Sequence, residues 1–198
     1  MDDSERSRRA VLGATAAGLA AAAGCSSTGS EGDATGTTEP TEAATDATTR
    51  TATEAQVDWR TAELTDVTTG ETFTVAGLAD APVILEFFAV WCPVCTRQQQ
   101  HLATFAADDP DAVPISVNVD PNESAETVRK HAAEHGFDWR YAVAPTDVTS
   151  ALVDEFGTVV TSPPAAPVAR VCPDGDAALL SGRGVKSAGD IAAAVDEC

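Results

Sequence analysis

Two cysteines, Cys92 and Cys95, lie close together directly after a short and nearly uniformly apolar run. That run, residues 83–89, has the composition of a strand covered on both faces of a sheet. Residues 96–107 follow with one apolar face, which predicts a helix that begins at the cysteines. The positive end of its dipole would favour a thiolate, the form of cysteine that attacks a disulfide. The pattern therefore predicts a strand–helix unit with a reactive dithiol at the helix start.

Strand-like and helix-like segments alternate through the rest of the folded part, which begins at Val57. Asp147 is expected to cap one helix and Ser187 to open the last. Expected strands cover residues 72–75, 83–89, 113–120, 139–143, 168–172 and 177–181, and expected helices cover residues 96–107, 125–135, 148–156 and 191–198. Alternation that ends in a hairpin and a helix predicts an α/β fold, a mixed central sheet flanked by helices on both faces.

The first 25 residues have the pattern of an export signal. Arg8 and Arg9 form a twin-arginine pair, and the apolar residues 10–24 are too few for a spanning helix. Cys25 follows Ala-Ala-Gly, which resembles a lipobox, although Ala22 stands where a larger aliphatic residue is usual. We predict residues 1–25 to be a twin-arginine lipoprotein signal that leaves the protein lipid-anchored, through Cys25, on the outer face of the cytoplasmic membrane. Ordinary cleavage near the alanine run and an uncleaved anchor are the alternatives.

Residues 26–56 are rich in Thr, Ala and Glu and contain no aromatic residue. Such a composition buries too little apolar surface to offset the entropy of ordering, so it predicts a disordered linker. The folded domain is then expected to cover residues 57–198.

The chain is strongly acidic, with 12 basic against 31 acidic residues and a net charge of −19. Phosphate binding needs basic surface, so the balance argues against a nucleic-acid partner. Acidity spread along the whole chain, with few lysines, favours a halophilic protein whose self-repulsion is screened by salt. A simpler interpretation is an acidic, soluble protein.

The segment Trp-Cys-Pro-Val-Cys at residues 91–95 resembles the active site of the thioredoxin superfamily, specifically the membrane-anchored TlpA/ResA-like thiol-disulfide oxidoreductases. The Ser-Val-Asn-Val-Asp strand at residues 116–120, followed by an extra helix, is similar to the insertion of that group. The resemblance covers residues 57–198 and implies a thioredoxin-like fold and disulfide exchange without a cofactor. It also implies thiol- or disulfide-bearing exported proteins as substrates and an electron donor or acceptor in the membrane.

The resemblance implies roles for individual residues. Cys92, expected to be exposed, would attack, and Cys95 would resolve the mixed disulfide. Trp91 and Pro93 would flank the site and contact substrate. Glu86 stands where thioredoxins bury a carboxylate that exchanges protons with the resolving cysteine, although it could instead be solvated at an edge.

Two further features follow from the resemblance. A cis-proline is expected opposite the cysteines; Pro167 has the better spacing to Gly175, and Pro164 is the alternative. Proline in the first place between the cysteines is typical of oxidant members and glutaredoxins, so the direction of electron flow stays open.

Cys172 and Cys198 are the remaining cysteines of the folded part. The strand that begins at the cis-proline and the last helix should both end at the pole away from the active site. We therefore expect a structural disulfide between Cys172 and Cys198, with two unpaired thiols as the alternative.

Other classes of function are less well matched. A peroxiredoxin-like peroxidase needs Pro-x-x-x-Thr-x-x-Cys, whereas Leu85 and Ala89 occupy those positions before Cys92. A non-catalytic copper chaperone or binding lipoprotein of this fold would use Cys-x-x-x-Cys and a distal histidine. His131 and His135 have helical spacing but no third ligand, so they predict a solvated helix face and not a metal site.

Overall fold

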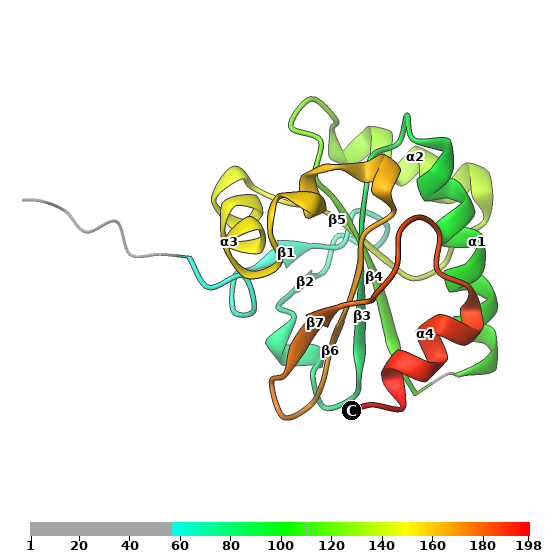
Figure 1. Cartoon of the computed structure of the whole chain (residues 1–198). Helices are drawn as coiled ribbons and strands as arrows, with labels where there is room; N and C mark the ends of the chain where they lie inside the picture. Colours follow the sequence, from blue (N-terminus) through cyan, green and yellow to red (C-terminus); the bar gives the residue numbers. More distant parts are fainter. Residues whose placement is uncertain (1–56, 110) are drawn as a thin grey trace, which may run out of the picture. The chain divides into compact units, whose positions relative to one another are not determined.

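The computed structural model describes residues 57–109 and 111–198. The predicted signal and the predicted linker lie outside the described residues. Within them, a five-stranded sheet has the strand order β5-β4-β3-β6-β7 (Figure 1). Its strands are β3 (Val83–Phe88), β4 (Val113–Asn118), β5 (Arg140–Val143), β6 (Val168–Val171) and β7 (Ala177–Leu179). The pairs β3–β4 and β4–β5 are parallel, whereas β3–β6 and β6–β7 are antiparallel, so the sheet is mixed as predicted.

Helices cover both faces of this sheet, which confirms the predicted α/β architecture. The helices are α1 (Pro93–Asp108), α2 (Ala125–His135), α3 (Thr146–Phe156) and α4 (Ala188–Val195). One core cluster joins Leu102 of α1, Val128 of α2 and Ile191 of α4 to Phe88 of the sheet. Figure 1 shows α1 in green and α4 in red on one side of the sheet and α3 in yellow on the other. No helix in the described part of the chain is both long and apolar enough to span a membrane.

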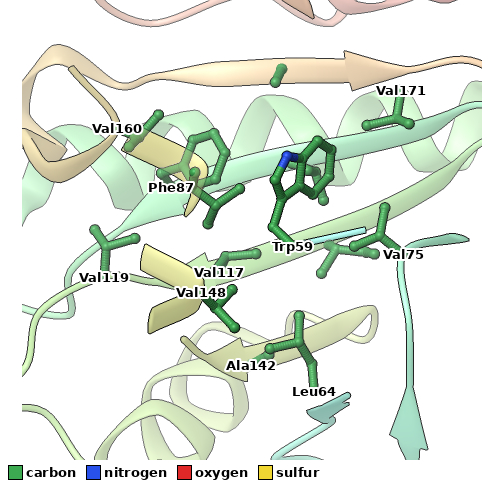
Figure 2. Packing of buried hydrophobic residues seen from close by; sticks show 14 of the residues in the cluster. Trp59, Leu64, Val75, Phe87, Val117, Val119, Ala142, Val148, Val160 and Val171 are labelled. Carbon is green, nitrogen blue, oxygen red and sulfur yellow. The ribbon is translucent and has the colours of Figure 1, made fainter. Parts of the chain in front are cut away.

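The opposite face packs against α3 and the small antiparallel pair β1 (Leu64–Thr65) and β2 (Thr72–Phe73). Trp59 lies in this core, next to Phe156 and across from Phe87 (Figure 2). Because side chains alternate along a strand, Leu85 and Phe87 point into this core. Glu86 points to the other face, toward α1, as do Ile84 and Phe88.

Several local predictions need correction. The strands expected over residues 113–120 and 177–181 each end two residues earlier, at Asn118 and Leu179. The strand expected over residues 72–75 ends at Phe73, because Val75 precedes a short 3-10 helix, Ala76–Leu78. The helix predicted to begin at Val148 begins at Thr146; Asp147 does not cap it, since its Oδ1 accepts only the N–H of Val148. The last helix begins three residues earlier than expected, because Ser187 is its N-cap and forms a reciprocal capping box with Asp190; it ends at Val195.

A disulfide links the residue that follows β6 to the last residue of the chain. Cys172 and Cys198 are joined by a disulfide, which encloses a sequence separation of 26 residues. Closing a loop of that length lowers the entropy of the unfolded chain and stabilises the fold by about 3.5 kcal/mol on the loop-entropy model. The bond thus secures α4, which packs directly on α1, the helix that carries the candidate redox pair.

Candidate active site

The two cysteines lie at the N-terminus of α1. Cys92 is the N-cap residue, Pro93 begins the helix, and Cys95 lies in its first turn. The backbone N–H of Cys95 donates a hydrogen bond to Cys92 Sγ over 3.2 Å, and neither cysteine is in a disulfide. A thiolate accepts such a bond more strongly than a thiol does. The arrangement suits a nucleophilic sulfur at position 92.

Cys92 is buried, with 1% of its surface exposed, which corrects the prediction of an exposed thiol. The reason is its place as N-cap: the sulfur is folded back over the first turn of α1 to accept the Cys95 N–H. Its neighbour Trp91 takes the exposed position instead, at 58%. Contact with a bulky substrate therefore requires the Cys92 sulfur to rotate outward, with Trp91 and Pro93 already at the surface.

Trp91 is held in place by the loop after β4. Its indole Nε1 donates to Asp120 Oδ2 over 2.6 Å. The N–H of Asn122, and then the indole of Trp91, hold the pKa of Asp120 below its usual range. Asp120 is therefore ionised at neutral pH, which strengthens its bond to the indole.

Cys95 is as buried as Cys92, with 1% of its surface exposed. Its Sγ donates to the carbonyl oxygen of Pro163 over 3.3 Å. Burial, and next the hydrogen bond with Cys92, raise the pKa of the Cys95 thiol above its usual range. Cys95 is therefore kept as a protonated thiol at neutral pH.

Glu86 is the buried carboxyl group of the site. It has no exposed surface, and its Oε2 accepts hydrogen bonds from Ser116 Oγ (2.7 Å) and Gln99 Nε2 (3.1 Å). Burial raises the pKa of Glu86 to about 8, against the lowering effect of these two bonds. Its Oε1 has no hydrogen-bond partner. That oxygen is free to take up and release a proton, and the charge of Glu86 is close enough to raise the pKa of Cys95.

The prolines divide between two places. Pro163 is buried and presents its carbonyl to Cys95, a contact that the sequence analysis did not single out. Pro167 directly precedes β6, and its carbonyl oxygen accepts the N–H of Phe87 over 3.1 Å. Between them, Ala166 has a left-handed backbone with φ 47°, the only such conformation among the described residues other than glycine. The chain thus turns sharply at Ala166, close to the segment that contacts Cys95. Strained backbone of this kind is common in functional sites. Which proline is cis stays a prediction.

A partly buried carboxylate, Glu123, supports the segment before the cysteines and was missed. Both of its oxygens accept the N–H of Val90, at 3.0 and 2.8 Å, and one accepts Asn118 Nδ2 at 2.5 Å. Ser116 and Gln99, which bind Glu86, were missed as well. Nothing in the local sequence marks these residues, because each meets a partner from a distant segment.

A mostly apolar cleft of about 470 Å³ opens beside the redox pair. Trp91, Asp120 and Pro163 line it on the side of the cysteines, and Val143–Thr146 line the far side. Two of its wall residues contact the cysteine segment: Asp120 accepts the indole N–H of Trp91, and the carbonyl oxygen of Pro163 accepts the thiol of Cys95.

Comparison with known proteins identifies the family and the fold. The protein-family model described as Redoxin matches residues 40–170, more than half of the chain. The chain belongs to the Redoxin family. The match begins inside the predicted linker, before Val57, and ends in β6. No curated protein is similar enough to match this Redoxin-family chain.

Solved structures show the same fold. A secreted Mycobacterium tuberculosis disulfide oxidoreductase homologous to E. coli DsbE is 16% identical, with a TM-score of 0.55 over 69% of this chain and 96% of that one. A putative electron transfer protein from Aquifex aeolicus is 20% identical, with a TM-score of 0.54 over 67% and 90%. A thioredoxin-like protein from Aeropyrum pernix is 20% identical, with a TM-score of 0.51 over 69% and 89%. These structures confirm the predicted thioredoxin-like fold.

Proposed function

We propose that this Redoxin-family protein is a thiol-disulfide oxidoreductase that acts on exported proteins through Cys92 and Cys95. The observation that carries the proposal is the helix-start dithiol next to a buried, high-pKa carboxyl group, Glu86. A buried carboxyl group without a cationic partner is costly to keep, so a proton-transfer role explains it better than packing does.

The proposed reaction balances two electrons. The Cys92 thiolate attacks one sulfur of a substrate disulfide, which forms a Cys92–substrate disulfide and releases one substrate thiolate. Cys95 then gives its proton to the Glu86 carboxylate and attacks the Cys92 sulfur. This step releases the second substrate sulfur as a thiolate, which takes the proton back from Glu86 or from water, and leaves a Cys92–Cys95 disulfide. Run in reverse, the same steps oxidise a substrate dithiol.

The pKa of about 8 suits Glu86 to this role. A proton carrier works best when its pKa lies near the operating pH, because both of its forms are then populated. An ordinary glutamate, with a pKa near 4.5, would be too weak a base for a buried thiol.

The surface around Cys92 fits a protein substrate. Trp91 and Pro93 are exposed on either side of the cysteine, and the cleft beside them is wide enough for an apolar side chain of the substrate. We infer that the backbone near Pro167 completes this surface. The direction of electron flow follows from the potential of the Cys92–Cys95 couple: a value near −270 mV makes the protein a reductant and one near −120 mV an oxidant.

Trapping tests the proposed function. A Cys95→Ala variant is expected to accumulate a mixed disulfide between Cys92 and a peptide that contains a disulfide, because the resolving thiol is absent. The adduct is measured by mass spectrometry under non-reducing conditions. A Cys92→Ala variant is the matched control and should form no adduct. Adduct formation by the Cys92→Ala variant, or by neither variant, would contradict the assignment.

We also propose that the protein is exported by the twin-arginine route and held at the outer face of the cytoplasmic membrane by a lipid on Cys25. At that membrane it would exchange electrons with a membrane donor or acceptor. The support is the order of Arg8, Arg9, the apolar run and Cys25 in the sequence. A Cys25→Ala variant is expected to move from the membrane fraction to the soluble fraction, and an Arg8→Lys/Arg9→Lys variant to stay inside the cell. Unchanged fractionation of both variants would rule the proposal out.

The alternative functions have less support. At the positions where a peroxidase needs proline and threonine, Leu85 and Ala89 are both buried and apolar. For the metallochaperone, the described residues contain no group of three or more His, Cys, Asp or Glu side chains that would hold a metal ion.

A further inference from the structure

His131 occupies a different place from the one expected. It lies on α2 and was predicted to share a solvated helix face with His135, but only 5% of its surface is exposed. Its position places it on the same helix face as Val128 and Ala132, which pack toward the sheet. The ring stacks on Phe88, with centroids 5.7 Å apart, and lies 6.2 Å from Phe137.

A hydrogen-bond chain connects this histidine to the candidate proton carrier. His131 Nε2 lies 2.7 Å from Gln99 Oε1, and Gln99 Nε2 donates to Glu86 Oε2. When Glu86 is ionised, its oxygens only accept hydrogen bonds, so the NH₂ group of Gln99 then faces Glu86. Its Oε1 then faces His131, and His131 Nε2 has to carry the proton.

We propose that His131 is a positioning residue that sets the proton affinity of Glu86 by fixing the orientation of the Gln99 amide. Without the imidazole N–H, the amide is free to turn over and present its oxygen to Glu86. That orientation suits only a protonated carboxyl group, which can donate to the oxygen. The inference rests on the proposed function, because the proton of Glu86 matters to the reaction only if Cys95 uses it.

The groups around His131 show that it acts on Glu86 through a hydrogen bond and not through a charge. From α2, His135 lies with its ring 4.7 Å from that of His131, and Glu134 is nearby; Glu123 acts from the segment before α2. From α1 the facing polar group is neutral Gln99, through which Glu86 of β3 is reached. Burial, and then His135, lower the pKa of His131. The ring is therefore neutral where Glu86 titrates, so it acts through its N–H and not through a charge.

The test is the pKa of Glu86 in reduced full-length protein, measured by the carboxyl ¹³C shift or the infrared band of the protonated acid. His131→Phe keeps a ring between Phe88 and Phe137 but removes the donor. It is expected to raise the pKa of Glu86 by about one unit, the effect of one hydrogen bond to a charged group. His135→Phe, which changes the neighbouring exposed imidazole and leaves the bond to Gln99, should leave the pKa unchanged. His131→Gln, which retains a donor, should restore most of it.

A double-mutant cycle and the wild-type protein complete the test. In a Gln99→Met background, His131→Phe is expected to have no further effect on Glu86, since the connecting amide is gone. In the wild type at pH 8, imidazole ¹⁵N shifts should report protonated Nε2 and bare Nδ1. An unchanged pKa in His131→Phe, an equal shift in His135→Phe, or the opposite tautomer would each overturn the inference. None of these measurements uses substrate. A negative result for His131 therefore does not contradict disulfide exchange by Cys92 and Cys95. A failure of the protein to exchange disulfides likewise does not change the pKa values or the imidazole shifts.

Discussion

Replacing Cys92 by serine is expected to lower the rate of disulfide exchange by at least about a thousandfold, the scale of loss when a catalytic nucleophile is removed. A serine hydroxyl is not ionised near neutral pH, and it forms no exchangeable bond with sulfur. The rate is measured as turnover of a peptide disulfide with a small thiol as the final reductant. A Cys92→Ser protein that works at the wild-type rate would refute the proposed mechanism.

The matched control is Cys95→Ser, which removes the other sulfur of the pair. In the absence of the small thiol, which would itself reduce the mixed disulfide, it is expected to keep the first attack by Cys92 and to release one equivalent of substrate thiol before it stalls. The two serine variants therefore differ in kind: one shows no burst of thiol and the other shows a single burst. Because Cys92 is buried as N-cap of α1, the variants should be compared for folding by circular dichroism first.

Much of the fold and the centre of the site could be predicted because their signals are local. An apolar run followed by a dithiol and a one-faced helix specifies β3, the redox pair and α1 within about 25 residues of sequence. The place of Glu86 inside that run left two alternatives, a buried carboxyl group and a solvated one at an edge, and the structure has it buried. The pairing of Cys172 with Cys198 was expected from the strand that the family resemblance places after the cis-proline, with two unpaired thiols as the alternative, and the structure has the disulfide.

The features that were missed depend on contacts between distant segments. Glu123 holds Val90 from 33 residues away, and His131 meets Gln99 from 32 residues away. The sequence of α2 gives an amphipathic helix but does not say which face turns to the sheet, so His131 was placed in solvent. The burial of Cys92 depends on which way one side chain turns, and the start of α3 depends on a proline at its N-cap position.

Replacing Glu86 by glutamine is expected to make the protein more stable at high pH than the wild type. Burial raises the pKa of Glu86 from its ordinary value of 4.5 to about 8. The folded protein thus binds this proton more tightly than the unfolded chain does. Stability from this group is complete below about pH 4.5 and is lost as the pH rises through about 8. A shift of this size corresponds to a loss of about 4 to 5 kcal/mol in the free energy of unfolding.

The measurement is urea unfolding of wild type and Glu86→Gln between pH 4 and 9 at fixed salt. The difference between the two free energies isolates Glu86, because the other acidic groups are common to both proteins. Glu126→Gln, at an exposed position on α2, controls for the loss of one negative charge. A difference that stays flat over this pH range would mean that Glu86 titrates in the ordinary range and is no proton carrier at neutral pH.

The same substitution should move function the opposite way. Without a base for the Cys95 proton, resolution of the mixed disulfide at pH 7 is expected to slow about a hundredfold, the usual contribution of a general base. The first attack by Cys92, which does not use that proton, should keep its rate. A variant that is more stable at pH 8 and slower only in resolution would tie the instability of the wild type to its chemistry. A glutamate that served packing alone would change stability and leave the resolution step untouched.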